Sequence, residues 1–347
     1  MSAHLDIDLD VLDANLAVIR ERVAPARHML VVKDDAYGHG VAPVARRAWD
    51  AGVRWFGTFD VANGIVVRQE LGPDARVFAW MIGSREDAEL AVAADLDLGV
   101  GDPDLLEDAA AVRAQRVHLK IDTGLHRNGI RPEDWPAVVA RAARLESDGA
   151  IRVVGVWSHI AEASDTEDDA ARAVFDWAVD EARAAGLDPG LRHLAASAAS
   201  FARAEFRYDL VRVGAFAYGI HPAGGPEADA LGIRPIARLT APVLAVTDDT
   251  VEIGIGMLDG LPSALAGRVS VGTPGGTRRL ERIDATQSQV QGWPDATVGD
   301  EVTVYGPGGS GECTATGLAE AIDTIGEEIA LRVSPALPRR YRRDVSG

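Results

Sequence analysis

The chain has 347 residues, a mass of 36.7 kDa and a formal net charge of -18, from 35 basic and 53 acidic residues. A negative balance of this size disfavours nucleic acid or an anionic membrane as a partner. The single cysteine, Cys313, excludes an internal disulfide, and the eight histidines show no HxxxH spacing, so we expect no metal site. The sequence has no secretory leader pattern and no apolar run of membrane-spanning length, which predicts a cytoplasmic protein.

Residues 28 to 219 contain eight short apolar, β-branched runs that alternate with Ala-rich segments of helical spacing. This rhythm predicts a (β/α)8 TIM barrel. An open doubly wound sheet is the structural alternative, but no GxGxxG turn follows the first run. The predicted strands are His28–Lys33, Val53–Phe59, Val77–Ile82, Leu96–Val100, Val117–Ile121, Val153–His159, Leu191–Ser197 and Leu210–Val213.

The composition changes after Gly219, where the Gly/Pro-rich segment His221–Pro235 is typical of a linker. Beyond it, RLTAPVLAV, TVEIGIG, GRVSV, RRLERID and GDEVTVYG alternate in strand fashion, which predicts a smaller, mainly antiparallel β domain. We expect a helix near Thr316–Thr324, a strand at Glu328–Val333 and a solvated basic tail, PRRYRR. The predicted domains are therefore a barrel over 1–225 and a β-rich domain over 226–347.

Polar side chains stand at or near the C-terminal ends of several predicted barrel strands. In a (β/α)8 barrel these ends converge on one face, which holds the active site. Each residue taken alone has a structural explanation, because a strand-end lysine is usually a surface charge and a lone histidine usually a core residue. Their convergence on one ligand explains all of them together. The residues are Lys33, Asp122, Arg127, His159, Ser197 and Arg212.

The sharpest local signal is VVKDDAYGHG (31–40), where a lysine ends an apolar strand before a Gly-flanked loop. A partly desolvated lysine there has a lowered pKa and can form an imine with an aldehyde cofactor. The stretch resembles the KADAYGHG motif of the alanine racemase family, from which Asp34 departs. HLKIDTGLHRNGI (118–130), GVWSHIAEAS (155–164), and HLAASAAS with VRVGAFAYGI (193–220) also resemble family motifs, in the family's order and at similar spacing.

The resemblance implies pyridoxal 5′-phosphate as cofactor, held as a Schiff base on Lys33, which would also act as the base on one face of the substrate. Because arginine keeps its proton, a pairing of Arg212 with the ring nitrogen would leave that nitrogen unprotonated and favour simple proton exchange at Cα. Lys120 matches a position that is carbamylated in some members. The other implied contacts are Tyr37, Ser197 and the amides of Gly214 and Ala215 with the phosphate, Arg127 with the phenolate, and His159 stacked on the ring.

The resemblance also implies a homodimer with shared active sites, in which the β domain of one subunit supplies a tyrosine as the second acid/base. Here the chain reads LAVTDDTVEIGIGMLDGLPSALAG, from which the loop that would carry this tyrosine is missing. Met257 and Glu327 stand where the family has tyrosines, and Ala285 and Thr286 stand at the key sites of its GRVCMDQ segment. One positioned acid/base contributes a factor of about 10² to 10⁴, so two-base racemisation would suffer. Substitute bases on this surface would be Asp248, Asp249, Glu252 and Asp259, although each also fits an exposed turn charge.

The leading hypothesis is a pyridoxal phosphate-dependent racemase of the alanine racemase family that acts on a small amino acid. A second hypothesis keeps the cofactor but limits chemistry to the lysine face, as in a decarboxylase, an aldolase or an epimerase. A third is a non-catalytic pyridoxal phosphate-binding protein, which would bind the cofactor without a spectral response to amino acids.

Overall fold

The computed structural model describes residues 2–247 and 249–342, which form two compact units. The barrel unit comprises Ile19–Asp34 and Val41–Gly214, and the C-terminal unit comprises the other described residues. Helices α1 (Leu9–Val23) and α2 (Lys33–Gly38) each contain residues of both units.

The barrel unit contains an eight-stranded sheet in the order β8-β7-β6-β5-β4-β3-β2-β9, and neighbouring strands pair in parallel. Backbone hydrogen bonds from Asp209 to Arg192 and from Arg212 to Ala195, both 3.1 Å, join the two edge strands. The predicted (β/α)8 barrel is confirmed. The strands are β2 (Arg27–Val31), β3 (Trp55–Thr58), β4 (Arg76–Ala79), β5 (Asp97–Val100), β6 (Val117–Lys120), β7 (Val153–Trp157), β8 (Leu191–His193) and β9 (Leu210–Val213).

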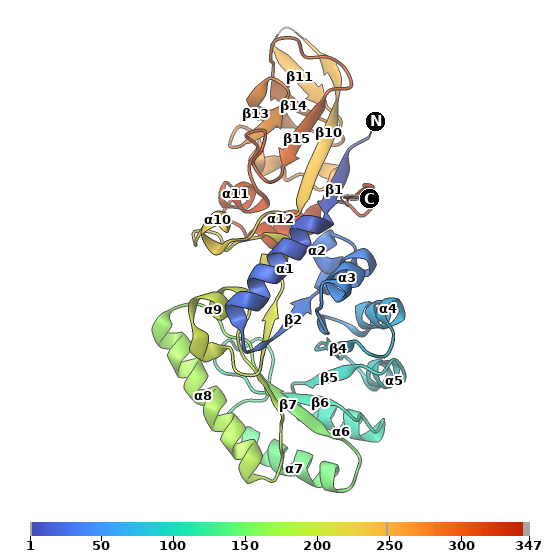
Figure 1. Cartoon of the computed structure of the whole chain (residues 1–347), viewed down its shortest axis with the longest axis vertical. Coiled ribbons are helices and arrows are strands. Elements are labelled where there is room, and N and C mark those ends of the chain that lie inside the picture. Colours follow the sequence, from blue (N-terminus) through green and yellow to red (C-terminus); the bar gives the residue numbers. More distant parts are fainter. Residues whose placement is uncertain (1, 248, 343–347) are drawn as a thin grey trace. The chain divides into compact units, whose positions relative to one another are not determined.

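Helices follow the barrel strands and lie outside them (Figure 1). Several begin at a side-chain cap: the carboxylate of Asp60 accepts the amide of Asn63 at 2.7 Å, and the hydroxyl of Ser164 accepts that of Glu167 at 3.2 Å. Such caps satisfy amide groups that have no partner within the helix. The helices are α3 (Val41–Asp50), α4 (Val61–Leu71), α5 (Arg85–Ala93), α6 (Pro103–Ala111), α7 (Trp135–Ser147), α8 (Asp165–Ala184), α9 (Ser197–Ala202) and the 3-10 turn η1 (Ala204–Phe206).

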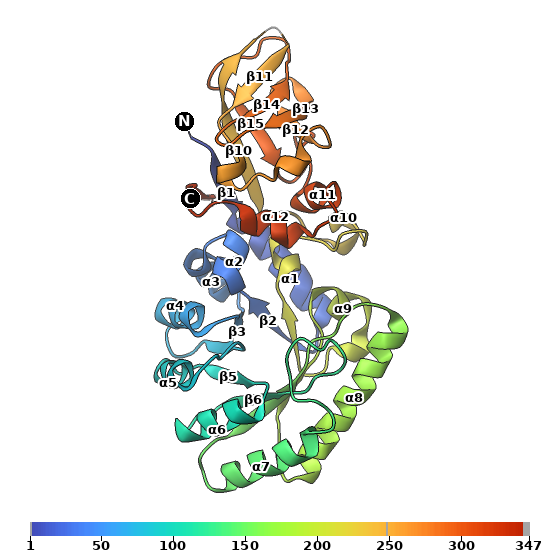
Figure 2. The ribbon, with the colours of Figure 1, turned by 180° about the vertical axis from the view of Figure 1, so that it is seen from behind.

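The C-terminal unit is built on a second eight-stranded sheet, in the order β11-β14-β13-β12-β15-β10-β1-β16, with a further pairing of β10 and β11. That pairing closes six of the strands into a ring (Figure 2). The pairs are antiparallel except for β1 with β16, so the predicted β domain is confirmed. The strands are β1 (His4–Asp8), β10 (Ala237–Val246), β11 (Thr250–Ile253), β12 (Ser270–Thr273), β13 (Gly276–Ile283), β14 (Ser288–Gln291), β15 (Glu301–Tyr305) and β16 (Arg339–Arg342).

Short helices complete the C-terminal unit, and one of them corrects a prediction. The segment expected to form a strand at Glu328–Val333 is helical, because Glu328 and Arg332 form an i,i+4 ion pair of 2.6 Å that suits a helix. The basic tail is also ordered: β16 pairs with β1, and Arg342 contacts Asp6 at 2.7 Å. The elements are η2 (Ala215–Tyr218), α10 (Ala228–Leu231), η3 (Met257–Asp259), η4 (Ser263–Leu265), α11 (Ala315–Glu320) and α12 (Gly326–Arg332).

Helix α2 is left-handed, which is unusual for L-amino acids. Four successive residues other than glycine, Asp34 to Tyr37, have φ angles between 52° and 56°, and Gly38 follows at 77°. This left-handed conformation costs roughly 1 to 2 kcal/mol for each L-residue. The turn begins directly after Lys33, so the backbone around that residue is held in a strained form.

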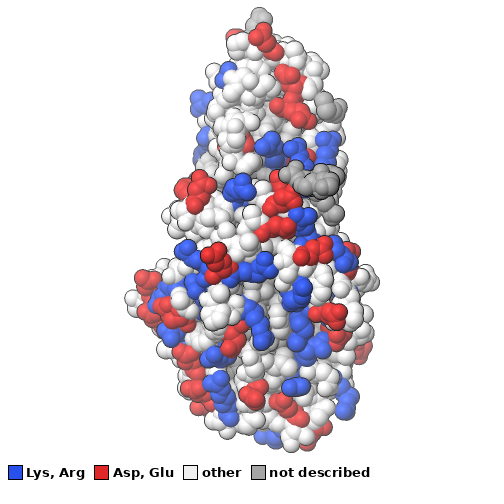
Figure 3. Space-filling model, viewed as in Figure 1, with Lys and Arg blue, Asp and Glu red and all other residues white. Residues whose placement is uncertain are grey.

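The surface agrees with a chain of mixed charge. Figure 3 shows acidic and basic side chains interspersed over the face in view. Among the described residues, no helix is long and apolar enough to span a membrane.

Candidate active site

Lys33 follows strand β2 at the C-terminal end of the barrel. The strand is buried from His28 to Val31, whereas the Lys33 side chain keeps 33% of its surface exposed. Its Nζ lies 3.7 Å from the Oδ2 of Asp34. The barrel therefore presents a primary amine at the face where the sequence predicts the active site.

Four cations among the predicted site residues of the barrel unit act on His159. Burial lowers the pKa of His159 to about 3, and the positive charges of Arg212, Arg127, Lys120 and Lys33 contribute to that decrease. Of the four, Arg212 comes within 3.5 Å of the imidazole. His159 is consequently neutral at pH 7, and the surrounding field favours an anionic ligand.

Arg212 is buried and held by several acceptors. Its Nη1 donates to the carbonyl of His193 at 2.9 Å, and its Nη2 donates to the carbonyls of Ser158 at 2.6 Å and Leu194 at 3.0 Å. Nη2 also lies 3.5 Å from the Nδ1 of His159. Burial, assisted by the charge of Arg127, lowers the pKa of Arg212 to about 9, so the guanidinium stays charged at pH 7. These contacts fix its plane.

A row of polar side chains runs from Arg212 through the barrel interior to the opposite end of the strands. The Nη1 of Arg212 lies 3.2 Å from the Nδ1 of His193, whose Nε2 is 2.9 Å from the Nδ1 of His118. The Nε2 of His118 is 3.2 Å from the Oδ2 of Asp97. Burial raises the pKa of Asp97, but hydrogen bonds and charges from His118 and Arg76 lower it to about 2.

Our sequence interpretation gave no role to Asp97, His118 or His193. The available signal was an ionisable residue inside an otherwise apolar strand, as in LDLGV, VHLK and LRHL. Because such groups are costly to bury without partners, three of them on neighbouring or nearby strands predict a connected network.

The loop that carries Arg127 is fixed by Asp122. Its Oδ1 accepts the amides of Gly124 and His126 at 3.0 and 3.1 Å, and its Oδ2 lies 2.9 Å from the Nδ1 of His126. Gly129 has φ of 129°, and a side chain there would collide with the backbone of Asp122. The sequence DTGLHRNG therefore forms a compact loop that carries Arg127.

Lys120 lies inside the barrel next to this loop. Its Nζ sits 4.5 Å from the centroid of the Trp157 ring, and the side chain is buried. Burial, with the charges of Arg212 and Arg127, lowers the pKa of Lys120 to about 8. About a tenth of the amine is then neutral at pH 7, far more than for an ordinary lysine, and the neutral amine is the form that reacts with carbon dioxide.

Ser197 and Gly214 form a small set of donors on neighbouring elements. Ser197 is the first residue of α9, and its Oγ accepts the amide of Gly214 at 3.3 Å. The next residue, Ala215, begins η2 in the C-terminal unit, to which Tyr37 also belongs. There the Tyr37 ring packs against Tyr218 with centroids 4.9 Å apart.

In the C-terminal unit, β10 ends at Val246 and β11 begins at Thr250, so the connection between them is short. The backbone amide and hydroxyl of Thr247 both donate to the carbonyl of Thr250, at 2.9 and 3.0 Å. Asp248 lies outside the described residues. Asp259 accepts the amide of Gly256 at 2.9 Å and so caps the turn that holds Met257.

The chemistry of the barrel donors fits pyridoxal phosphate. An amine suits its aldehyde, a hydroxyl with a backbone amide suits its phosphate, and fixed guanidinium groups suit its ring nitrogen and phenolate. Among the described residues there is no group of three or more histidine, cysteine or acidic side chains that could hold a metal.

Comparisons with known proteins cover nearly the whole chain. The family models of the alanine racemase N-terminal and C-terminal domains match residues 7–222 and 244–341. A protein named alanine racemase from Thermobifida fusca is 38% identical over 98% of both chains, and one from Frankia casuarinae is 38% identical over 96% of this chain and 95% of its own. The crystal structure of alanine racemase from a D-cycloserine producing Streptomyces lavendulae superposes with a TM-score of 0.92 at 31% identity, covering 99% of this chain and 98% of the other.

Proposed function

Because the chain belongs to the alanine racemase family, we propose that it is a pyridoxal phosphate-dependent isomerase that interconverts L- and D-alanine. The observation that carries the proposal is the cluster of Lys33, Arg127, Lys120 and Arg212 around the neutral imidazole of His159. It supplies the amine and the positive charges that an anionic aldehyde cofactor needs.

When bound, pyridoxal phosphate withdraws electrons from the substrate and so acidifies its Cα proton. In the proposal, Lys33 holds the cofactor and moves the proton on its own side of Cα. Arg212 would donate to the ring nitrogen and leave it without a proton, because its own pKa of about 9 keeps the guanidinium charged at pH 7. His159, neutral at pH 7, would stack against the ring without adding a charge.

The proposed phosphate site of the barrel unit is built from the hydroxyl of Ser197 and the amide of Gly214. The contacts of Ala215 and Tyr37 with the phosphate remain predictions from the family resemblance. Arg127 serves the phenolate oxygen. Lys120 is proposed to carry a carbamate, because its lowered pKa leaves reactive neutral amine. A carbamate would also place a negative charge among the cations.

We further propose a cytoplasmic homodimer in which the C-terminal unit of one subunit closes the active site of the other. The exposed Met257 and Leu258, with 47% and 72% of their surface in water, support an apolar contact there. They belong to a hollow of about 460 Å³ that Leu261 and Arg332 also line. Sedimentation equilibrium should give a dimer mass, and Leu258→Asp should lower it.

The site is tested directly by borohydride trapping, which reduces the lysine-bound cofactor to a stable secondary amine. The chain contains only two lysines, Lys33 and Lys120, so peptide mapping distinguishes them. We expect the label on Lys33, lost in Lys33→Ala and retained in Lys120→Met. Label on Lys120 alone, or none, would overturn the site. Racemisation is then measured by chiral chromatography of L-alanine incubations.

The short β10–β11 turn favours a second candidate function, in which only the lysine face is active. Such an enzyme would exchange the Cα proton of an amino acid with deuterium without losing optical activity. Racemisation requires both exchange and inversion, so one incubation in deuterium oxide separates the two. Inversion of L-alanine at the rate of exchange would exclude the one-sided reaction.

A further inference from the structure

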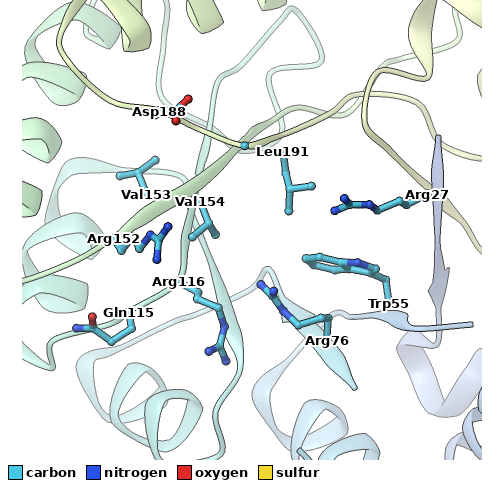
Figure 4. Close-up of a pocket in the computed structure, with 11 residues that line it drawn as sticks. Arg27, Trp55, Arg76, Gln115, Arg116, Arg152, Val153, Val154, Asp188 and Leu191 are labelled. Atoms are coloured by element: carbon cyan, nitrogen blue, oxygen red, sulfur yellow. The ribbon is translucent and has the colours of Figure 1, made fainter. Parts of the chain in front are cut away.

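A second hollow lies at the N-terminal ends of the barrel strands, the opposite end from Lys33. It has a volume of about 510 Å³. Its lining comes from the starts of six strands or the residues just before them, including Arg27, Trp55, Arg76, Arg116, Arg152 and Leu191. We call it the basal pocket (Figure 4).

The basal pocket has more positive than negative charge. Arg76 and Arg116 share Asp97, with the Nη2 of Arg76 at 2.6 Å from its carboxylate. Within the described part of the chain, neither Arg27 nor Arg152 has an ion pair. Their charges act on carboxylates at longer range. The charge of Arg27 contributes to lowering the pKa of Asp209, and that of Arg152 partly offsets the increase that burial causes in the pKa of Glu146.

Of the residues that the structure describes, four arginines but only one acidic residue, Asp188, line the pocket. At least one positive charge of the pocket therefore remains unbalanced. Four arginines around one hollow stand out in a chain with a net charge of -18. Because like charges repel, an arrangement of this kind is most favourable when an anion lies between them.

Donor geometry supports the same conclusion. The Nε of Arg76 is buried and, in the described part of the chain, has no hydrogen-bond acceptor. Its guanidinium lies over the Trp55 ring, 4.6 Å from the centroid. Figure 4 shows Arg27 and Arg76 directed toward the hollow beside Trp55, with Val154 and Leu191 on the other side. The lining therefore combines charged donors with the apolar side chains of Val154 and Leu191.

We propose that the basal pocket binds a small organic phosphate. Planar guanidinium groups match phosphate oxygens in pairs, which favours a phosphate over a simple halide. The volume exceeds the need of a bare phosphate and lies in the range of small-molecule sites. The apolar side formed by Val154 and Leu191 accommodates the organic part of the ligand.

The test is calorimetric titration of the full chain, saturated with pyridoxal phosphate so that the cofactor's phosphate site is filled. The probe is inorganic pyrophosphate at constant ionic strength. We expect one site per chain, and about ten-fold or greater weakening in Arg27→Ala/Arg152→Ala, because each arginine supplies charged hydrogen bonds. Both residues are exposed and without ion pairs among the described residues, so the variant should fold; Arg152→Gln serves as a milder second variant.

The matched control is Arg144→Ala/Arg183→Ala, which removes the same charge from the outer helices α7 and α8. It should leave pyrophosphate binding within about two-fold, since neither arginine lines the basal pocket and exposed charges are screened by salt. No binding heat at millimolar pyrophosphate would overturn the proposal. Equal weakening in both double variants, or no weakening in Arg27→Ala/Arg152→Ala, would do the same.

Discussion

Replacing Asp97 with asparagine should destabilise the barrel strongly. The Asp97 side chain is fully buried, and its carboxylate contacts Arg76, Arg116 and His118. The Asp97→Asn substitution keeps the shape of the side chain but removes its charge. The two guanidinium groups would then lie close together without a shared anion, and His118 would lose its ionised partner.

The pKa of Asp97 sets the size of the effect. A decrease from 3.8 to about 2 corresponds to roughly 2 to 3 kcal/mol of stabilisation of the ionised form at pH 7. Because the folded pKa is the lower one, this stabilisation is present above pH 4 and disappears as the pH falls from about 4 to about 2. Around 1 kcal/mol of it should be lost by pH 3.

The assay is urea unfolding of the cofactor-free chain, followed by tryptophan fluorescence at pH 7 and at lower pH. The matched control is Asp95→Asn, which removes a 58% exposed carboxylate that also contacts Arg116 and should cost less than about 1 kcal/mol. Equal losses in the two variants at pH 7 would refute the reasoning. The reasoning would also be refuted if the difference in the free energy of unfolding between Asp97→Asn and the parent did not decrease below pH 4.

Three further predictions concern other parts of the barrel. Gly155→Ala would place a methyl group on the ring of His118, so the variant should lose about 1 to 3 kcal/mol in thermal unfolding. Ser197→Ala should weaken pyridoxal phosphate binding about ten-fold, measured by fluorescence titration. Burial lowers the pKa of His28 from 6.5 to about 4, so folding opposes its protonation and stability falls as the pH drops from about 6.5 to 4. Between pH 7 and pH 5, the free energy of unfolding of His28→Gln should therefore decrease by about 2 kcal/mol less than that of the parent.

Each has a control. Gly190→Ala adds a methyl group with nothing within 4 Å and should melt like the parent; a parent-like melt of Gly155→Ala would contradict the first prediction. Ser200→Ala removes a hydroxyl from the same helix that donates to the carbonyl of Ser197 instead, and should keep cofactor affinity. An unchanged affinity in Ser197→Ala would exclude its proposed role. A pH dependence of His28→Gln equal to the parent's would exclude the third.

The barrel was predictable because its strands are apolar on both faces and regularly spaced along the sequence. The C-terminal unit was predictable only in part. Strand β1 pairs with β10, more than 200 residues away, and a sequence window cannot reveal that pairing. For the same reason the sequence predicted a solvated tail, although the arginines of that tail extend the sheet next to β1.

The residues of the candidate site also differ in whether the sequence could predict their connection. Lys33, Arg127, His159 and Arg212 belong to contiguous motifs, and the charges of the three cations contribute to the lowered pKa of His159. Asp97, His118 and His193 belong to three separate strands, so their connection depends on the barrel's closure and register. The basal pocket escaped prediction because its arginines are distributed over segments that are far apart in sequence.

The left-handed turn of α2 determines which amino acids the chain tolerates beside its reactive lysine. Asp34 and Asp35 are exposed, and by contact with neighbours alone many side chains would be accepted at both. Their positive φ angles instead admit glycine, asparagine and aspartate and penalise valine, isoleucine and threonine. In a saturation library selected for folding, the residues accepted at positions 34 and 35 should accordingly be those that tolerate a positive φ angle. These two surface positions should then accept as few residue types as buried positions do.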